Sequence, residues 1–198
     1  MGQLRDLLSS DGPDIKAVEE YLNSLGSEER VREVRTLERA HQKLLYDTAE
    51  GHKPISLDHI VAKQQPAMSE VVHYGKNSLG AFTHFAKVFV RSEDAANGEL
   101  WGYNRGSGFV ETVVGPGYFV TYPHEVDGEL LVDYLRVPPS KPDHWPKILS
   151  NSARLSMFVY NGTQDILRGV SEHVSIGRAT RRGKPMSAWF VLCREDVS

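Results

Sequence analysis

A change in the spacing of apolar residues near position 82 constrains this chain more than any other feature of its sequence. From there to about residue 137, apolar and polar residues alternate with a period of two, the pattern of β-strands that bury one face. Turn residues interrupt this region at short intervals, at Asn97-Gly98, Gly115-Pro116-Gly117 and Asp127-Gly128. Closely spaced strands joined by short turns pair in opposite directions, so the segment predicts an antiparallel sheet.

The first 51 residues have a helical pattern instead. Apolar residues recur three and four positions apart over 14–25, Gly26 ends this helix, and Ser27 is a suitable N-cap for a second helix that ends at Gly51. Two amphipathic helices joined by a tight turn predict an αα-hairpin. We expect an accessory helical hairpin over 1–51, acidic in charge, and an α+β domain over 52–198.

The C-terminal part adds one helix and two strands. Ser152 is a suitable cap for a helix that runs to about residue 173, and 174–181 and 186–194 are typical of strands. Strands grouped together between helices favour an α+β fold. The sequence therefore predicts an antiparallel sheet of about six strands, with one long helix (about 152–173) inserted before the last two strands.

Composition narrows the function classes. The chain has 198 residues, 40% hydrophobic and 25% charged, which are ordinary values for a globular protein. Cys193 is the single cysteine, and no signal peptide or apolar run of about 20 residues is present, so we expect a cytoplasmic protein without a membrane span. A net charge of −3 argues against nucleic-acid binding. The eight histidines lack metal-ligand spacing, so neither a metal nor another cofactor is expected.

Three residues are candidates for acid–base catalysis. His84 shares a strand face with Ala86 and Val88, where a half-buried imidazole would titrate near neutral pH, and His124 continues the face of the strand 118–122. Asp133 alternates with apolar residues and would need a cation or a raised pKa if it faced the core. The alternatives are a hydrogen-bonded core histidine and an Asp133 that faces solvent.

Aromatic residues on the strands are candidates for a binding pocket. Trp101 and Tyr103 share one strand face, and Tyr118 and Tyr122 share another, so their rings and hydroxyl groups could surround a ligand. The guanidinium group of either of two arginines could hold an anionic group of that ligand. These are Arg105 and Arg178. The alternative is ordinary sheet packing with solvated arginines.

Three functions are compatible with these features. We favour a small-molecule-binding module with an apolar, aromatic-lined pocket and an anion-accepting arginine. The first alternative is an enzyme that uses histidine and aspartate as acid and base, although no catalytic motif is present. The second is an assembly protein whose acidic hairpin over 1–51 docks on the basic strands of another copy.

Overall fold

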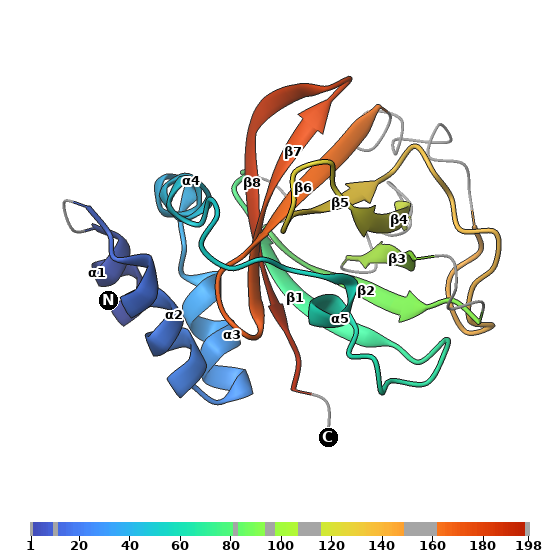
Figure 1. The fold of residues 1–198 in the computed structure, drawn as a ribbon, viewed down its shortest axis with the longest axis horizontal. Coiled ribbons are helices and arrows are strands. Elements are labelled where there is room, and N and C mark those ends of the chain that lie inside the picture. Colours follow the sequence, from blue (N-terminus) through green and yellow to red (C-terminus); the bar gives the residue numbers. More distant parts are fainter. Residues whose placement is uncertain are drawn as a thin grey trace.

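Eight antiparallel strands of the described residues close into a barrel, and Figure 1 shows this barrel beside the N-terminal helices. The computed structural model describes residues 2–9, 12–80, 83–93, 98–106, 116–148 and 162–196. The strands follow one another around the barrel in chain order, and the last pairs with the first. They are β1 (Val71–Asn77), β2 (His84–Arg91), β3 (Leu100–Arg105), β4 (Tyr118–Pro123), β5 (Leu130–Asp133), β6 (Thr163–Gly169), β7 (Val174–Arg181) and β8 (Lys184–Arg194).

The predicted fold class is therefore wrong. An α+β fold with a six-stranded sheet and a long helix is replaced by a closed barrel with short helices. Residues 163–169, expected within that helix, form β6, where buried and half-exposed residues alternate strictly. The inward face of β6 carries the polar residues Thr163 and Asp165. Buried and half-exposed positions therefore do not alternate as apolar and polar residues, and hydrophobicity alone does not reveal this strand. The remaining helical residues, 152–161, lie outside the described part, as does an expected strand over 109–114.

Several local predictions are confirmed. Strands were expected near 82–91, 99–104, 118–122 and 129–137, and in the two C-terminal segments, and β2, β3, β4, β5, β7 and β8 lie there. β1 begins within 68–74, where the sequence fits either a strand or a helix. This added strand and the unexpected β6 complete the closure of the sheet.

The N-terminal region contains four short helices, not a two-helix hairpin. They are α1 (Gln3–Ser9), α2 (Ile15–Ser24), α3 (Ser27–Arg35) and α4 (Arg39–Thr48). The expected second helix is interrupted between Arg35 and Arg39, where Leu37 is fully buried. The new helix start is capped locally, because the backbone N–H of Glu38 donates to His41 Nδ1 at 3.2 Å. This break lets α3 pack on β1 and β8 while α4 crosses β7 and β8.

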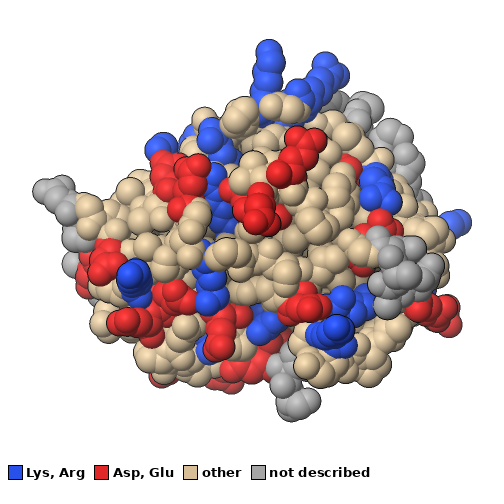
Figure 2. Space-filling view, viewed as in Figure 1, with Lys and Arg blue, Asp and Glu red and all other residues tan. Residues whose placement is uncertain are grey.

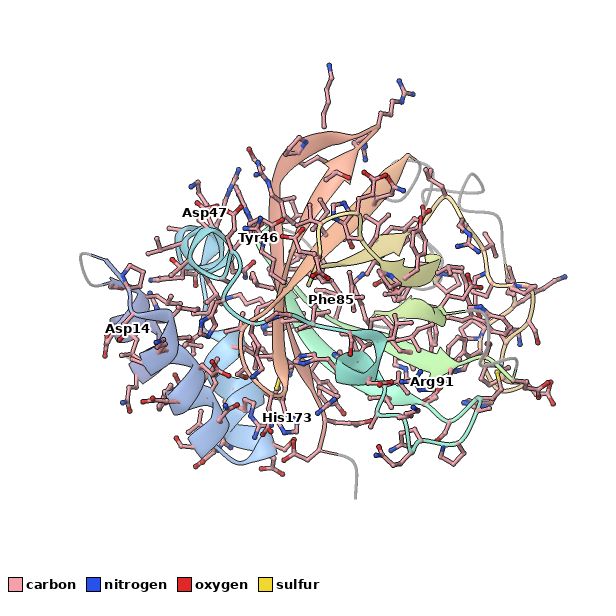
Figure 3. All side chains as sticks on the ribbon, viewed as in Figure 1. Asp14, Tyr46, Asp47, Phe85, Arg91 and His173 are labelled. Carbon is pink, nitrogen blue, oxygen red and sulfur yellow. The ribbon has the colours of Figure 1, made fainter. Side chains whose placement is uncertain are left out.

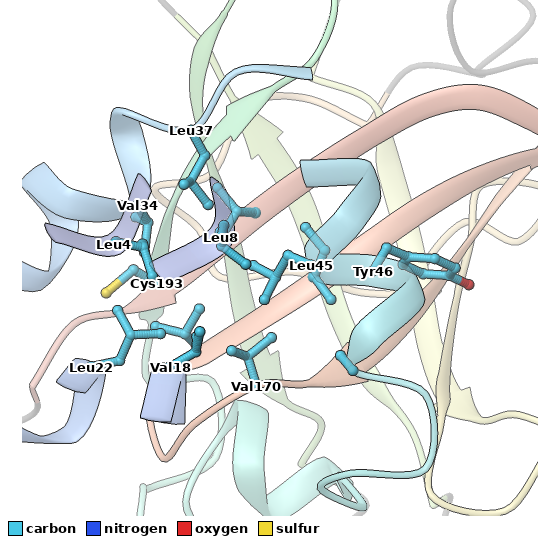
Figure 4. Packing of buried hydrophobic residues seen from close by; sticks show 14 of the residues in the cluster. Leu4, Leu8, Val18, Leu22, Val34, Leu37, Leu45, Tyr46, Val170 and Cys193 are labelled. Carbon is cyan, nitrogen blue, oxygen red and sulfur yellow. The ribbon is translucent and has the colours of Figure 1, made fainter. Parts of the chain in front are cut away.

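The four helices cover one side of the barrel wall. Their apolar residues meet the outer faces of β7 and β8 in a single cluster, seen from close by in Figure 4. Leu22, Val34 and Leu45 are fully buried in this cluster, and Cys193 contacts it from the barrel side. The apolar stripes of residues 1–51 are therefore buried against the chain's own barrel. None of the helices in the described ranges has the length and apolar character needed to cross a membrane.

Glycines on the inner wall hold aromatic rings against the strand backbone. A Cβ atom at Gly75, Gly102 or Gly177 would lie under 3.0 Å from a ring atom of Phe85, Phe119 or Phe190, respectively. Each ring thus occupies the space of the missing side chain on a neighbouring strand. Because the rings lie along the wall, the inside of the barrel is lined by aromatic surface.

One end of the barrel is closed by the short helix α5 (Leu57–Ile60). Inward-pointing side chains at the ends of β2 and β8 bond to it. Arg91 donates to Asp58 and to the Val61 carbonyl, and Arg194 donates to the His59 carbonyl. Figure 3 shows Arg91 near α5 and Phe85 inside the barrel. His73 Nε2 donates to the Ile60 carbonyl at 2.9 Å, so α5 is bonded to three strands.

His73 makes this closure sensitive to acid. Its side chain is 1% exposed, and burial lowers its pKa from 6.5 to about 3, against the opposing effect of the Ile60 hydrogen bond. At pH values between about 3 and 6.5, the His73 side chain binds a proton in the unfolded chain but stays neutral in the folded chain. The free energy of unfolding should therefore fall as pH is lowered through this range, by up to about 1.4 kcal/mol per pH unit from His73 alone. Urea unfolding at several pH values should show a smaller slope for His73→Gln, and an equal slope in both proteins would contradict this assignment.

Candidate functional site: a buried polar cluster inside the barrel

Four polar side chains from four parts of the barrel meet in its interior. Lys87 comes from β2, Asn104 from β3, Asp165 from β6, and Tyr134 directly follows β5. None is more than 8% exposed. All four lie toward the end of the barrel opposite α5, where β3 and β5 end and where β2 and β6 begin. We refer to these four residues as the Lys87 cluster.

The strand register brings the cluster together. Side chains alternate between the two faces of a strand, so Phe85, Lys87 and Phe89 point inward together. Lys87 is directly opposite Asn104 in the β2–β3 pairing. The sequence did not identify Lys87 because its neighbours Ala86 and Val88 suggested that the other face of β2 is the buried one. In the structure both faces are buried, as expected for a barrel wall that is itself covered.

Hydrogen bonds connect all four members. Lys87 Nζ donates to Asn104 Oδ1 at 3.0 Å, to Asp165 Oδ2 at 3.3 Å, and to the Tyr134 hydroxyl. The Tyr134 hydroxyl donates to Asp165 Oδ2 at 3.2 Å, and the Asn104 amide donates to the Tyr134 oxygen at 3.1 Å. The ammonium group therefore has a neutral hydroxyl and a carboxylate beside it, which can exchange protons.

Aromatic rings surround the lysine. Nζ of Lys87 lies 4.8 Å from the ring centroid of Phe119, 4.9 Å from that of Tyr134, 5.0 Å from that of Phe190 and 5.8 Å from that of Phe85. The faces of these rings attract a cation. This attraction compensates for only a small part of the hydration energy that the ammonium group loses on burial. Among the described residues, the carboxylate that bonds to this cation is Asp165.

Burial acts on both charges of the pair. It lowers the pKa of Lys87, although the nearby Asp165 carboxylate opposes this shift. It raises the pKa of Asp165, against the effects of Lys87 and of the Tyr134 hydrogen bond. Both groups are thus displaced toward their neutral forms, which is typical of functional sites.

The aromatic residues predicted to line a pocket lie on the outer wall of the barrel. Trp101, Tyr103 and Tyr118 face outward from β3 and β4 and are covered by the segment 138–148. Trp145 of this segment packs on Tyr103, with ring centroids 4.7 Å apart. The other tyrosine of the set also points outward, at the far end of β4. It is Tyr122, whose hydroxyl donates to Asp133 at 2.8 Å.

The two arginines predicted to accept an anion have partners on the protein. Arg105 donates to Glu70 at 2.9 Å and to the Tyr103 hydroxyl at 3.0 Å. Arg178 donates to the Met186 carbonyl at 3.0 Å and lies over a ring of the outer wall. The exposed basic residues that follow are at the tip of the β7–β8 hairpin, where Figure 2 shows blue side chains that extend from the molecule.

The candidate catalytic residues are not brought together. His84 is the exposed first residue of β2, whereas His124 follows β4 at the opposite end of the barrel, with Nδ1 3.5 Å from Glu129. Asp133 is buried and accepts hydrogen bonds from the Tyr122 hydroxyl and from a backbone N–H. Within the described residues, no three or more histidine, cysteine, aspartate or glutamate side chains form a group that could hold a metal ion.

A surface pocket of about 340 Å³ lies on the outside of the barrel, between the end of α4, the segment 50–54 and the β4–β5 turn. Its charged groups neutralise one another. Arg168 donates to Glu129 at 2.7 Å, also bonds to the Tyr46 carbonyl, and lies 4.2 Å from the centroid of the Tyr46 ring. This pocket therefore offers a ligand fewer unsatisfied groups than its composition suggests.

Comparison with known proteins adds no functional information. No protein-family model matches the chain, and no curated protein has a significantly similar sequence.

Replacing Lys87 should expose the electrostatics of the cluster. In Lys87→Met the Asp165 carboxyl loses its cation, and the loss of unfolding free energy relative to wild type should be about 3 kcal/mol at pH 8. The loss should be smaller at pH 5, because a carboxyl whose folded pKa is raised binds a proton more readily in the folded than in the unfolded chain. Urea unfolding at both pH values measures this.

A double variant controls for the lost packing of the lysine. Lys87→Met combined with Asp165→Asn contains no buried charge in the cluster, so it should recover stability at pH 8 and lose the dependence on pH that is specific to Lys87→Met. Equal losses for Lys87→Met at pH 5 and pH 8 would show that Asp165 is not held ionised beside Lys87.

Proposed function

We propose that the barrel binds a small, largely apolar molecule in its interior, and that Lys87 receives the polar end of this molecule, a carboxylate or a carbonyl oxygen. The observation that carries the proposal is a buried lysine–aspartate pair in an aromatic barrel. Replacing such a pair with apolar residues is often neutral or stabilising. A protein that keeps it inside an otherwise apolar lining retains a feature that stability alone does not require.

The dimensions of the barrel support this function. Eight-stranded barrels have an interior that either is filled by side chains or holds one small ligand. Here three of the inward-facing rings pack on glycines of the wall, so the interior is lined by aromatic side chains. A lining of phenylalanine rings with a few convergent polar groups is the usual composition of a small-molecule site.

The positions of α5 and of the Lys87 cluster support an orientation for the ligand. Side-chain bonds from β1, β2 and β8 hold α5 across one end. The Lys87 cluster lies toward the other end. A ligand whose polar end met the lysine would extend from there along the aromatic rings toward α5.

The protonation of the pair also suits an anionic or carbonyl group. Burial raises the pKa of Asp165, so its carboxyl is closer to the neutral form than a surface aspartate. A ligand oxygen that accepted a hydrogen bond from Lys87 would then experience less repulsion from this carboxyl. The hydroxyl of Tyr134 donates to the same carboxyl, which holds Asp165 beside the lysine.

Fluorescent fatty acids provide a direct test. cis-Parinaric acid should bind the wild-type protein roughly tenfold more tightly than its methyl ester, because a charge-assisted hydrogen bond to Lys87 contributes about 1.5 kcal/mol or more. In Lys87→Met the acid and the ester should bind equally. The measurement is fluorescence titration with each probe.

A matched lysine variant serves as control. Lys43 is exposed on α4 and pairs with Asp47 at 2.6 Å, so Lys43→Met should keep the preference for the acid. The proposal is overturned if neither probe binds the wild-type protein, or if Lys87→Met retains the same preference as wild type.

A further inference from the structure

Lys87 has the surroundings of a reactive amine. A lysine becomes nucleophilic when desolvation favours its neutral form, and the side chain of Lys87 is 2% exposed among four aromatic rings. Burial accordingly lowers its pKa. Other lysines with carboxylate partners are more exposed. Lys43 and Lys53, for example, pair with Asp47 and Glu19 at 2.7 Å or less, with side chains 59% and 29% exposed.

The groups that carbonyl chemistry requires are bonded to this amine. Attack of an amine on a carbonyl carbon needs a proton donor for the developing oxyanion and an acceptor for the proton released from nitrogen. The Tyr134 hydroxyl and the Asp165 carboxyl both bond to Nζ, and they bond to each other at 3.2 Å. Asn104 bonds to Nζ and to the Tyr134 oxygen, so it holds the amine and the phenol in one geometry.

We propose that Lys87 forms an imine with an aldehyde or ketone bound inside the barrel. This inference rests on the proposed function and specifies its ligand class as apolar carbonyl compounds. The aromatic lining holds the apolar part of the ligand, and the Lys87 cluster holds the carbonyl group. Asp165, Tyr134 and Asn104 accept from the three N–H groups of the protonated amine, so the phenol and the carboxyl are held against the nitrogen before a ligand binds.

The steps balance without a further reactant. Lys87 first gives a proton to Asp165, so the pair starts as a neutral amine and a carboxylic acid. The nitrogen lone pair attacks the carbonyl carbon, a C–N bond forms, and the carbonyl π electrons move to oxygen, which takes a proton from Tyr134. The Tyr134 oxygen then takes a proton from the nitrogen, which leaves a neutral carbinolamine and restores the phenol. Asp165 protonates the hydroxyl group of the carbinolamine, this group leaves as water, and the nitrogen lone pair forms the C=N bond, so the product is a protonated imine beside the Asp165 carboxylate. No atom is oxidised or reduced overall, and hydrolysis reverses the sequence.

Reductive trapping tests the inference. The full chain is incubated with decanal at pH 7, borohydride is added, and the protein is digested and mapped by mass spectrometry. We expect one decyl adduct on Lys87, labelled at least about tenfold more than any other lysine, because at pH 7 a lysine with an ordinary pKa near 10.4 is almost entirely protonated. Labelling that is spread over exposed lysines with none on Lys87 would overturn the inference.

Variants separate the roles within the cluster. Lys87→Met should give no adduct at this position, and Tyr134→Phe should slow trapping on the order of a hundredfold by removing the proton donor. Lys43→Met should leave trapping at Lys87 unchanged. An unchanged trapping rate in Tyr134→Phe would remove the phenol from the reaction. The peptide map of the wild-type protein decides the main point even if a variant does not fold.

The two proposals fail in different ways. If cis-parinaric acid binds with the expected dependence on Lys87 but decanal does not label it, the barrel is a binding protein without imine chemistry. If neither probe reaches the interior, both proposals are wrong, and the Lys87 cluster is a structural element of the barrel.

Discussion

The pairing of β8 with β1 is the constraint on which the rest of this structure depends. Five residue pairs join β1 to β8, from His73 opposite Arg194 to Asn77 opposite Phe190, and they convert a sheet into a barrel without edges. Once the sheet is closed, every second residue of each strand is withdrawn from water. The energetics of His73, Lys87 and Asp165 follow from that closure, because each is titratable and faces inward.

The outer wall of the barrel is apolar because other parts of the chain cover it. The helices α1 to α4 cover β7 and β8, and the segment 138–148 covers β3 and β4 through Trp145. Strands that are buried on both faces lose the simple alternation of apolar and polar residues. In β2, Val88 lies under the covering segment while Phe89 lies inside the barrel, and both are fully buried. The aromatic residues of β3 and β4 therefore stabilise the wall instead of lining its interior.

Burying the charges of the Lys87 cluster costs free energy, and the same burial makes the cluster suited to bind or react with a ligand. A lysine and an aspartate are removed from water, and they are compensated by one another, by the phenol of Tyr134, by Asn104 and by aromatic rings. The same arrangement shifts both groups toward their neutral forms and places proton donors beside the amine. A site for a carboxylate or carbonyl group and a site for imine formation require the same features, so the binding and covalent proposals share one physical basis.

The sequence by itself determined the local elements. Turn residues and the period of two located β2, β3, β4, β5, β7 and β8, and the apolar stripe that ends at Gly26 located α2, because these signals act over a few neighbouring positions. Tertiary structure decided whether the sheet is open or closed, since the pairing of β1 with β8 joins residues more than 110 positions apart. It also decided which strand face points inward, because a wall covered on both sides makes the two faces equally apolar. For that reason the aromatic residues of the outer wall were accessible to sequence analysis, whereas Lys87 and Asp165 became a site only when the barrel closed around them.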